Sequence, residues 1–495
     1  MLEADRRNRS LSAFFCALIS KFPEIRKDRQ MTFDGNLPVA VIGAGPVGLA
    51  AAARLVEAGI TPLVLERGAS VGSSLIDWGH VRVFSPWKYN IDDAARRLLD
   101  DHGWNAPQAD EVPTGREIVQ NYLLPLSGTP QIAANLKLGA AVTAITRQGF
   151  DKVSSNGRED APFVVRYTDP AGEHDVLARA VIDASGTWTQ PNPMGINGLP
   201  VVGESASGRL SYGIPDVAGT RRSDFAGKRT LVVGSGHSAI NVALALLELQ
   251  QSDPATEIFW ALRHHGVARL LGGGLNDQLP ERGALGLAAK KAMDEGRLKM
   301  LTSFAARSVK SDGHEVVVEA VSNGEPVMLV LDHVVVTTGF RPDLSFLREL
   351  RLELDPAVEA SPALAPLIDP NLHSCGTVPP HGVIELAHPE RDFYIVGSKS
   401  YGRAPTFLMK TGYEQVRSVV AELAGDHVAA RRVELVLPET GVCSVDLAVN
   451  ATSSGCCGGP APVKTDACCV ADATAKSEGK AGCGCSTVIV EEERA

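Results

Sequence analysis

Two strand, glycine loop and helix units constrain what this chain can fold into more than any other feature of its sequence. The first has an apolar run over residues 37–42, the loop GAGPVG over 43–48, a helix of small residues and a second apolar run that ends at Glu66. The second has RTLVV over 229–233, the loop GSGHSA over 234–239, a helix and a further strand. This order of elements is typical of a dinucleotide-binding βαβ unit.

Each position of the first loop has a separate physical role. Gly43 makes the tight turn, Gly45 lets backbone amides approach a pyrophosphate, and Gly48 allows the helix to pack on the strand. Glu66, at the end of the second strand, can accept hydrogen bonds from the hydroxyls of an adenosine ribose. The predicted contacts of the first nucleotide are therefore Gly43, Gly45, Pro46, Gly48, Glu66 and Arg67.

The second loop differs in a way that indicates which nucleotide it binds. Ala239 takes the place of the third glycine and is still small enough for close packing. Where the first unit has Glu66, the second has Leu262 followed by Arg263, so no acid repels a phosphate there. An arginine at this place can pair with a 2′-phosphate, which favours NADPH over NADH. The predicted contacts of the second nucleotide are Gly234, Gly236, His237, Ser238 and Arg263.

Three later apolar runs also end in glycine turns, namely ASG at 184–186, TTG at 337–339 and IVG at 395–397. Such turns let the chain leave one nucleotide-binding domain and re-enter it beside the cofactor, so we expect Gly186, Gly339 and Gly397 to contribute to the site. A helix is expected to begin near Pro405, where its partial positive charge would favour an anionic group.

Taken in order, GAGPVG, Glu66, ASG, GSGHSA, Arg263, TTGFRPD and YIVG resemble the two-dinucleotide-binding-domain flavoproteins, and most closely the flavin-containing monooxygenase family. The resemblance covers about residues 37 to 425. It implies FAD and NADPH as cofactors, with Trp78, Phe84 and Ser85 near the flavin. It implies an α/β fold with two Rossmann-like domains, the FAD domain over 35–205 and 326–430 and the inserted NADPH domain over 206–325.

One segment departs from the pattern of that family. The stretch GLPVVGESASGRLSYG over 198–213 occupies the place of a motif that carries a phenylalanine, a glycine and a histidine. Gly203 keeps the glycine, but Val201 replaces the phenylalanine and Ser207 stands where the histidine would be. This change concerns the oxygenase reaction and leaves the cofactor-binding loops untouched.

A flavin reduced by NADPH can pass its electrons to oxygen, to a protein disulfide or to an external acceptor. The disulfide route needs a redox cysteine pair beside the ring, and the body of the chain has no C-x2-C or C-x4-C pair. An oxygenase needs no catalytic cysteine. The missing cysteine pair therefore favours a monooxygenase that acts on a small, soft nucleophile, with molecular oxygen as co-substrate. No catalytic acid or base can be assigned.

Six of the nine cysteines lie within the last forty residues, in a tail rich in glycine and alanine that is expected to be disordered. Vicinal thiols on flexible linkers suit soft ions such as trivalent arsenic, Cu(I) or Zn²⁺. The tail, with CCGGPAP, a second CC pair and a terminal CGC, resembles the flavoproteins encoded in bacterial arsenic-resistance operons. That resemblance implies a trivalent arsenical or its thiol conjugate as substrate. The predicted metal or metalloid ligands are Cys456, Cys457, Cys468, Cys469, Cys483 and Cys485.

Composition excludes several other classes of partner. The formal charge is −10 and no long basic run occurs, so no nucleic acid or anionic membrane surface is expected. No apolar run reaches the length of about 18 residues that a transmembrane helix needs. The three remaining cysteines are isolated in the sequence, which favours a reducing compartment such as the cytoplasm. Residues 1–34 are expected to be a poorly ordered extension or the product of an upstream start, and 431–495 a linker and tail.

Three hypotheses remain open on these grounds. The first is an FAD-dependent, NADPH-oxidising monooxygenase of a soft nucleophile. The second is an NADPH-dependent flavin reductase of disulfides or a metalloid. The third is a protein that sequesters a metalloid through its tail and carries the flavin domains passively.

Overall fold

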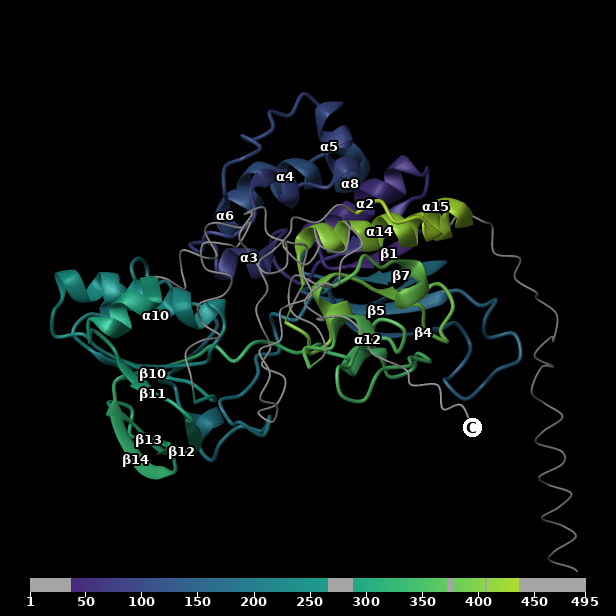
Figure 1. Ribbon diagram of the computed structural model, residues 1–495. Coiled ribbons are helices and arrows are strands. Elements are labelled where there is room, and N and C mark those ends of the chain that lie inside the picture. Colours follow the sequence, from purple (N-terminus) through teal and green to yellow (C-terminus); the bar gives the residue numbers. More distant parts are fainter. Residues whose placement is uncertain (1–36, 266–287, 372–377, 406, 436–495) are drawn as a thin grey trace, which may run out of the picture. The chain divides into compact units, whose positions relative to one another are not determined.

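In the computed structural model, the residues described are 37–265, 288–371, 378–405 and 407–435 (Figure 1). The predicted N-terminal extension, 1–34, and all nine cysteines lie outside these ranges, including the six predicted ligands of the tail. The described residues from Pro38 onward belong to one compact unit.

The first domain is built on a five-stranded sheet in the order β16-β7-β1-β2-β3, and every neighbouring pair is parallel. Its strands are short and apolar, as expected for a parallel sheet that is covered on both faces. They are β1 Val39–Ile42, β2 Pro62–Leu65, β3 Leu136–Lys137, β7 Ala180–Asp183 and β16 Phe393–Ile395.

Alternate residues of this sheet face two different layers. Val39 and Val41 lie in one core with the helices α2 (Pro46–Glu57), α5 (Asp93–Asp100) and α14 (Met409–Leu423). Ala40 and Ile42 lie in a second core with an antiparallel sheet that consists of β4 Ala141–Arg147, β5 Phe163–Asp169 and β6 Gly172–Ala178. Helices therefore cover one face of the first sheet and a three-stranded sheet covers the other.

The second domain repeats this architecture. Its parallel sheet has the order β11-β10-β9-β15-β8, α10 (His237–Ser252) covers one face, and an antiparallel sheet of three strands packs on the other. The parallel strands are β8 Leu210–Tyr212, β9 Arg229–Val233, β10 Glu257–Ala261, β11 Lys299–Leu301 and β15 His333–Val336. The antiparallel strands are β12 Ala305–Ser311, β13 Val316–Ser322 and β14 Glu325–Leu331. The predicted α/β fold with two dinucleotide-binding-like domains is confirmed.

The chain leaves the first sheet after β7, forms the second, and returns after β15 to add β16 to the first. The two connecting segments are hydrogen-bonded to each other, with Asn192 N donating to Gly339 O at 2.9 Å and Arg341 N to Gln190 O at 2.9 Å. The second sheet extends to Val336, beyond the expected limit at residue 325, because β15 pairs with β9.

Shorter helices lie between these elements, and none of the described helices is long and apolar enough to cross a membrane. In the first half they are α3 Ser73–Asp77, α4 Trp87–Asn90, α6 Gly115–Ile118, the π-helix η1 Val119–Leu123, α7 Leu124–Ser127, α8 Pro130–Ala133, the 3₁₀ helix η2 Glu204–Ala206 and α9 Arg222–Phe225. In the second half they are η5 Ser345–Leu347, α12 Ala365–Ile368, α13 Val383–Leu386, η6 Gly397–Tyr401 and α15 His427–Arg431.

Candidate cofactor-binding site

The three glycines of the first loop are required for different reasons. Gly43 has a φ of +97°, and a β-carbon there would lie 2.8 Å from the carbonyl oxygen of Ala184. A β-carbon at Gly48 would lie 2.0 Å from the carbonyl oxygen of Gly43. At Gly45, by contrast, a β-carbon would meet no atom within 4 Å. Gly43 and Gly48 are therefore fixed by packing within the protein, whereas Gly45 borders open space.

That open space lies at the start of α2. The helix begins at Pro46, and no side chain caps its N-terminus. The amides and the positive end of the helix dipole at this place favour an anion such as a pyrophosphate. The geometry at Gly45 and Pro46 thus fits the phosphates of a dinucleotide.

Glu66 follows β2 and is 8% exposed. One of its oxygens, Oε2, accepts a hydrogen bond from Ala44 N at 2.7 Å, and the other, Oε1, accepts one from Gly68 N at 2.7 Å. Two backbone amides therefore hold the carboxylate against the loop, and each oxygen keeps a lone pair that can accept from a ribose hydroxyl. Arg67 is exposed at the surface.

The second loop has the same construction. Gly234 has a φ of +141°, and a β-carbon there would lie 2.5 Å from Thr337 Oγ1. A β-carbon at Gly236 would meet no atom within 4 Å, as at Gly45, and Ala239 is fully buried. A side chain that the sequence did not single out, the buried Trp260, donates from Nε1 to the carbonyl oxygen of Gly234 at 2.8 Å. Nothing in the apolar run around Trp260 indicated this contact.

The glycine turns predicted after β7 and β15 lie next to these loops. Ala184 N donates to Ile42 O at 2.9 Å, and Thr337 N donates to Val233 O at 2.8 Å, so each turn is joined to the strand that precedes its loop. Gly186 and Gly339 have φ angles of +70° and +89°. The two turns are thus equivalent positions of the two domains.

The strand order places the predicted first-domain residues in a row along one edge of the sheet. Glu66 follows β2, Gly43 follows β1, Gly186 lies three residues beyond β7 and Gly397 lies two residues beyond β16. Neighbouring strands lie about 4.8 Å apart. A dinucleotide whose adenosine is bound at Glu66 would therefore cross the loop at Gly45 and extend towards Gly186 and Gly397, which is a fit for FAD.

The helix expected from Pro405 begins instead at Met409, so that expectation was wrong by one turn. Leu408 is extended, with φ −117° and ψ 144°, and the Phe407 ring packs against Tyr401 and the start of the helix. The helix still meets α2, because a β-carbon at Gly412 would lie 2.6 Å from Val47 Cγ2. The first turns of α2 and α14 thus lie side by side.

The remaining predicted residues lie in different surroundings. His237 and Ser238 open α10, and Arg263 is exposed shortly after β10. The ring of Phe84, expected near the flavin, packs edge-on against His237 of the second loop at 5.0 Å. Trp78 is half-buried and packs on Gly115, where a β-carbon would lie 2.9 Å from the indole ring.

Sequence reasoning missed an ion pair between Asp183 and Lys399, both 0% exposed. Lys399 Nζ lies 2.7 Å from Asp183 Oδ2 and 3.1 Å from Ser185 Oγ, and Ser185 Oγ donates to Asp183 Oδ1 at 2.6 Å. Burial raises the pKa of nearby Asp343, but hydrogen bonds from Ser345 and the charge of Lys399 hold that pKa below its ordinary value. The only signal in the sequence was a charged residue at the end of one buried strand and another a few residues beyond a second buried strand.

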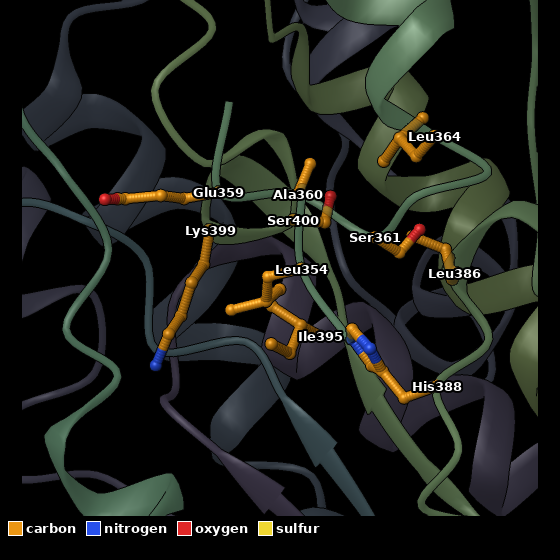
Figure 2. A pocket seen from close by; sticks show the side chains of 10 residues that line it. All are labelled: Leu354, Glu359, Ala360, Ser361, Leu364, Leu386, His388, Ile395, Lys399 and Ser400. Atoms are coloured by element: carbon orange, nitrogen blue, oxygen red, sulfur yellow. The ribbon is translucent and has the colours of Figure 1, made fainter. Parts of the chain in front are cut away.

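A small cavity of about 10 Å³ lies beside the last strand and is lined by Leu354, His388, Ile395 and the aliphatic part of Lys399 (Figure 2). It has room for about one water molecule and none for a substrate. Figure 2 shows the ammonium group of Lys399 pointing away from this cavity. The cavity is therefore not the reactive site.

No group of three or more histidine, cysteine, aspartate or glutamate residues that could hold a metal ion occurs in the ranges that the structure covers. The six tail cysteines lie outside those ranges, so their proposed role rests on the sequence alone.

Comparisons with known proteins agree with this geometry. The family model described as pyridine nucleotide-disulphide oxidoreductase matches residues 40–257. The chain is 26% identical over 209 residues to indole-3-pyruvate monooxygenase YUCCA1 of Oryza sativa subsp. japonica, and the match covers 42% of this chain and 44% of that protein. It is 24% identical over 330 residues to the ferredoxin–NADP reductase of Streptococcus equi subsp. zooepidemicus, which covers 66% of this chain and 79% of that protein.

Among solved structures, bacillithiol disulfide reductase Bdr (YpdA) from Bacillus cereus matches with a TM-score of 0.58 and 17% identity, over 79% of this chain and 99% of that chain. This likeness concerns the fold. The match to the rice monooxygenase spans less than half of that protein's length. These similarities agree with the expected class of enzyme, a flavin-dependent oxidoreductase with FAD and a nicotinamide nucleotide as its types of cofactor.

Proposed function

We propose that the protein is an FAD-dependent, NADPH-oxidising monooxygenase that acts on a soft nucleophile, with a trivalent arsenical as the favoured substrate. The observation that carries the proposal is the pair of equivalent glycine loops, each with an open second glycine at the edge of its own parallel sheet. One chain would thereby hold two separate dinucleotide-binding sites, which an enzyme needs if one bound nucleotide is to reduce another.

The two proposed binding sites differ in the charge of the side chain that follows the second strand of each unit. Glu66 beside the first loop suits the free ribose hydroxyls of FAD, whereas the second loop is followed by the exposed Arg263 and by no acid at the equivalent place. A guanidinium can pair with the 2′-phosphate that distinguishes NADPH from NADH. We therefore assign FAD to the first domain and NADPH to the second.

Oxygen is the proposed electron acceptor because the sequence before the cysteine-rich tail has no C-x2-C or C-x4-C pair that could act as a redox disulfide beside the flavin. Bound FAD would supply the redox chemistry. The residues of this chain would bind and orient the two nucleotides, through the loop amides at Gly45 and Gly236 and through Glu66 and Arg263. The segments around Gln190 and Arg341, which are hydrogen-bonded to each other, would connect the two domains.

The proposed reaction on arsenite consumes one oxygen molecule and one NADPH. Arsenite, oxygen, NADPH and a proton give arsenate, NADP⁺ and water. Arsenic is oxidised by two electrons and gains one oxygen atom, and NADPH supplies the two electrons that reduce the other oxygen atom to water. The cysteine pairs of the tail would capture the arsenical before it is oxidised. The reducing cytoplasm, which keeps these thiols free, is the compartment that we propose.

A second candidate is an NADPH-dependent reductase whose flavin reduces a disulfide formed by the tail or an external acceptor. The observation that favours it is the set of six tail cysteines, which lie close together in pairs. Similarity to ferredoxin–NADP reductase over most of that protein's length also supports it.

Steady-state coupling in the purified full chain separates the two candidates. With arsenite present, a monooxygenase forms one arsenate for each NADPH and each oxygen consumed, and releases little hydrogen peroxide. A variant with all six tail cysteines changed to serine keeps NADPH oxidation if oxygen is the acceptor and loses it if the tail is the acceptor. Arsenite that changes neither oxygen uptake nor peroxide release would refute the proposed substrate.

A further inference from the structure

The pair formed by Asp183 and Lys399 stands out because both charged side chains are completely buried. Lysine and aspartate are almost never fully buried without a partner, and burying such a pair seldom increases stability over an apolar pair of the same volume. The pair joins residues 216 positions apart in the chain. The burial of this pair therefore points to a function other than stability.

The position of the pair in the fold indicates that function. Asp183 is the last residue of β7, and Lys399 lies in η6, the short helix that follows β16. These are the neighbouring strands on the side of β1 that is opposite to β2 and Glu66. With the adenosine at Glu66 and the phosphates at Gly45, the flavin end of FAD would lie along the edge formed by the carboxyl ends of β7 and β16.

The pair holds both turns that border this edge. Through Ser185, Lys399 and Asp183 fix the turn that ends in Gly186, and Lys399 itself belongs to the turn that begins at Gly397. Ser398 Oγ faces Gly186 across the gap, 3.6 Å from the place of a β-carbon. The ammonium also lies 4.2 Å from the centre of the Phe346 ring, on the segment that returns from the second domain.

A second set of contacts holds the Gly397 turn from the helix side. Gln415 of α14 accepts a hydrogen bond from Gly397 N at 2.7 Å and donates to Ser400 Oγ at 2.9 Å. The turn is therefore fixed on both of its sides, by the ion pair and by the amide of Gln415. Such support is expected where a bound group must be placed accurately.

We propose that Asp183 and Lys399 are positioning residues for the flavin: the pair fixes the two turns on which the flavin end of FAD rests, and its balanced charge keeps that edge neutral. The inference depends on the proposed function, because it requires FAD in the first domain. It assigns to these two residues control over how fast NADPH reduces the flavin and over the potential of the flavin.

The test uses the full chain loaded with FAD and the variants Lys399→Met and Asp183→Asn. Lys399→Met leaves an unpaired negative charge at the carboxyl ends of β7 and β16, where the flavin end of FAD would rest, and should make the midpoint potential more negative. Asp183→Asn leaves a positive charge and should make it more positive. Both should alter the visible circular dichroism of bound FAD. We expect anaerobic reduction by NADPH to slow at least about tenfold in Lys399→Met, because a misplacement of about 1 Å can cost about a hundredfold.

A buried ion pair elsewhere in the same domain provides the matched control. Arg54 Nη2 lies 2.6 Å from Asp92 Oδ2, with the two side chains 12% and 0% exposed. Arg54 lies in the last turn of α2, about 12 Å along the helix from Pro46. Arg54→Met should therefore lower stability without changing the potential, the circular dichroism or the reduction rate of the flavin.

The double variant Asp183→Asn/Lys399→Met addresses misfolding, because it removes both charges and keeps the side-chain volumes. It should recover stability and still reduce slowly. Reduction at the wild-type rate in the double variant, or potentials in the single variants that match those of Arg54→Met, would overturn the inference. Wild-type protein that binds no FAD would instead refute the proposed function.

Discussion

Alanine substitutions at Gly45 and at Gly48 distinguish space that is open to a ligand from space that the protein itself fills. Gly48→Ala would bring a β-carbon to 2.0 Å from the carbonyl oxygen of Gly43. The backbone of the loop has to move, and overpacking of this kind costs about 1–3 kcal/mol of stability. Gly45→Ala meets no atom within 4 Å, and its φ of −79° is open to alanine, so the apoprotein should lose less than about 1 kcal/mol.

Gly45→Ala, which leaves the stability nearly unchanged, should instead weaken the binding of FAD. A methyl group there would occupy the place of the phosphates. Losing one hydrogen bond to a charged group costs about 1.5–3 kcal/mol, which corresponds to about a 10- to 150-fold weaker affinity.

Urea denaturation of both apoproteins and titration with FAD, followed by flavin fluorescence, measure the two quantities separately. The reasoning is refuted if Gly45→Ala binds FAD as the wild type does, or if it destabilises the apoprotein as much as Gly48→Ala.

Three further predictions concern other parts of the chain. Arg263→Ala should raise the KM for NADPH at least about tenfold and leave that for NADH nearly unchanged, because only NADPH carries the 2′-phosphate; equal effects in steady-state assays would remove Arg263 from the site. Glu390→Gln leaves two buried arginines, Arg147 and Arg158, without their carboxylate and should cost about 3–5 kcal/mol in urea denaturation, whereas Asp175→Asn, in an exposed ion pair, should change little. Burial lowers the pKa of His381 below its ordinary 6.5, so the unfolded chain takes up the proton first, and stability should be constant above about pH 6.5 and fall below it; denaturation midpoints that do not change between pH 7 and pH 5 would contradict this.

The glycine loops and turns could be predicted from the sequence because local geometry sets them. Gly43 and Gly48 are demanded by a turn and by helix packing within a span of six residues, so their spacing is visible in the sequence. The turns at Gly186 and Gly339 follow buried strands, which are equally local features.

The parts that sequence missed depend on contacts between distant segments. Lys399 meets Asp183 only because β16 returns to pair with β7. Phe84 contacts His237 of the second loop because two loops far apart in the chain come together, and no pattern in the sequence indicates this contact. Before α14, Leu408 is extended and Phe407 packs on Tyr401, a contact that no local helix signal encodes.

The most direct test of the central claim is a single-turnover experiment on the FAD-loaded full chain. The flavin is reduced anaerobically with one equivalent of NADPH and then mixed with oxygen, with and without arsenite, and arsenate and hydrogen peroxide are quantified. If the protein is a monooxygenase of arsenite, arsenite yields close to one arsenate for each reduced flavin and suppresses peroxide by the same amount. Electrons recovered entirely as peroxide, or already transferred to the tail cysteines before oxygen is added, would contradict it.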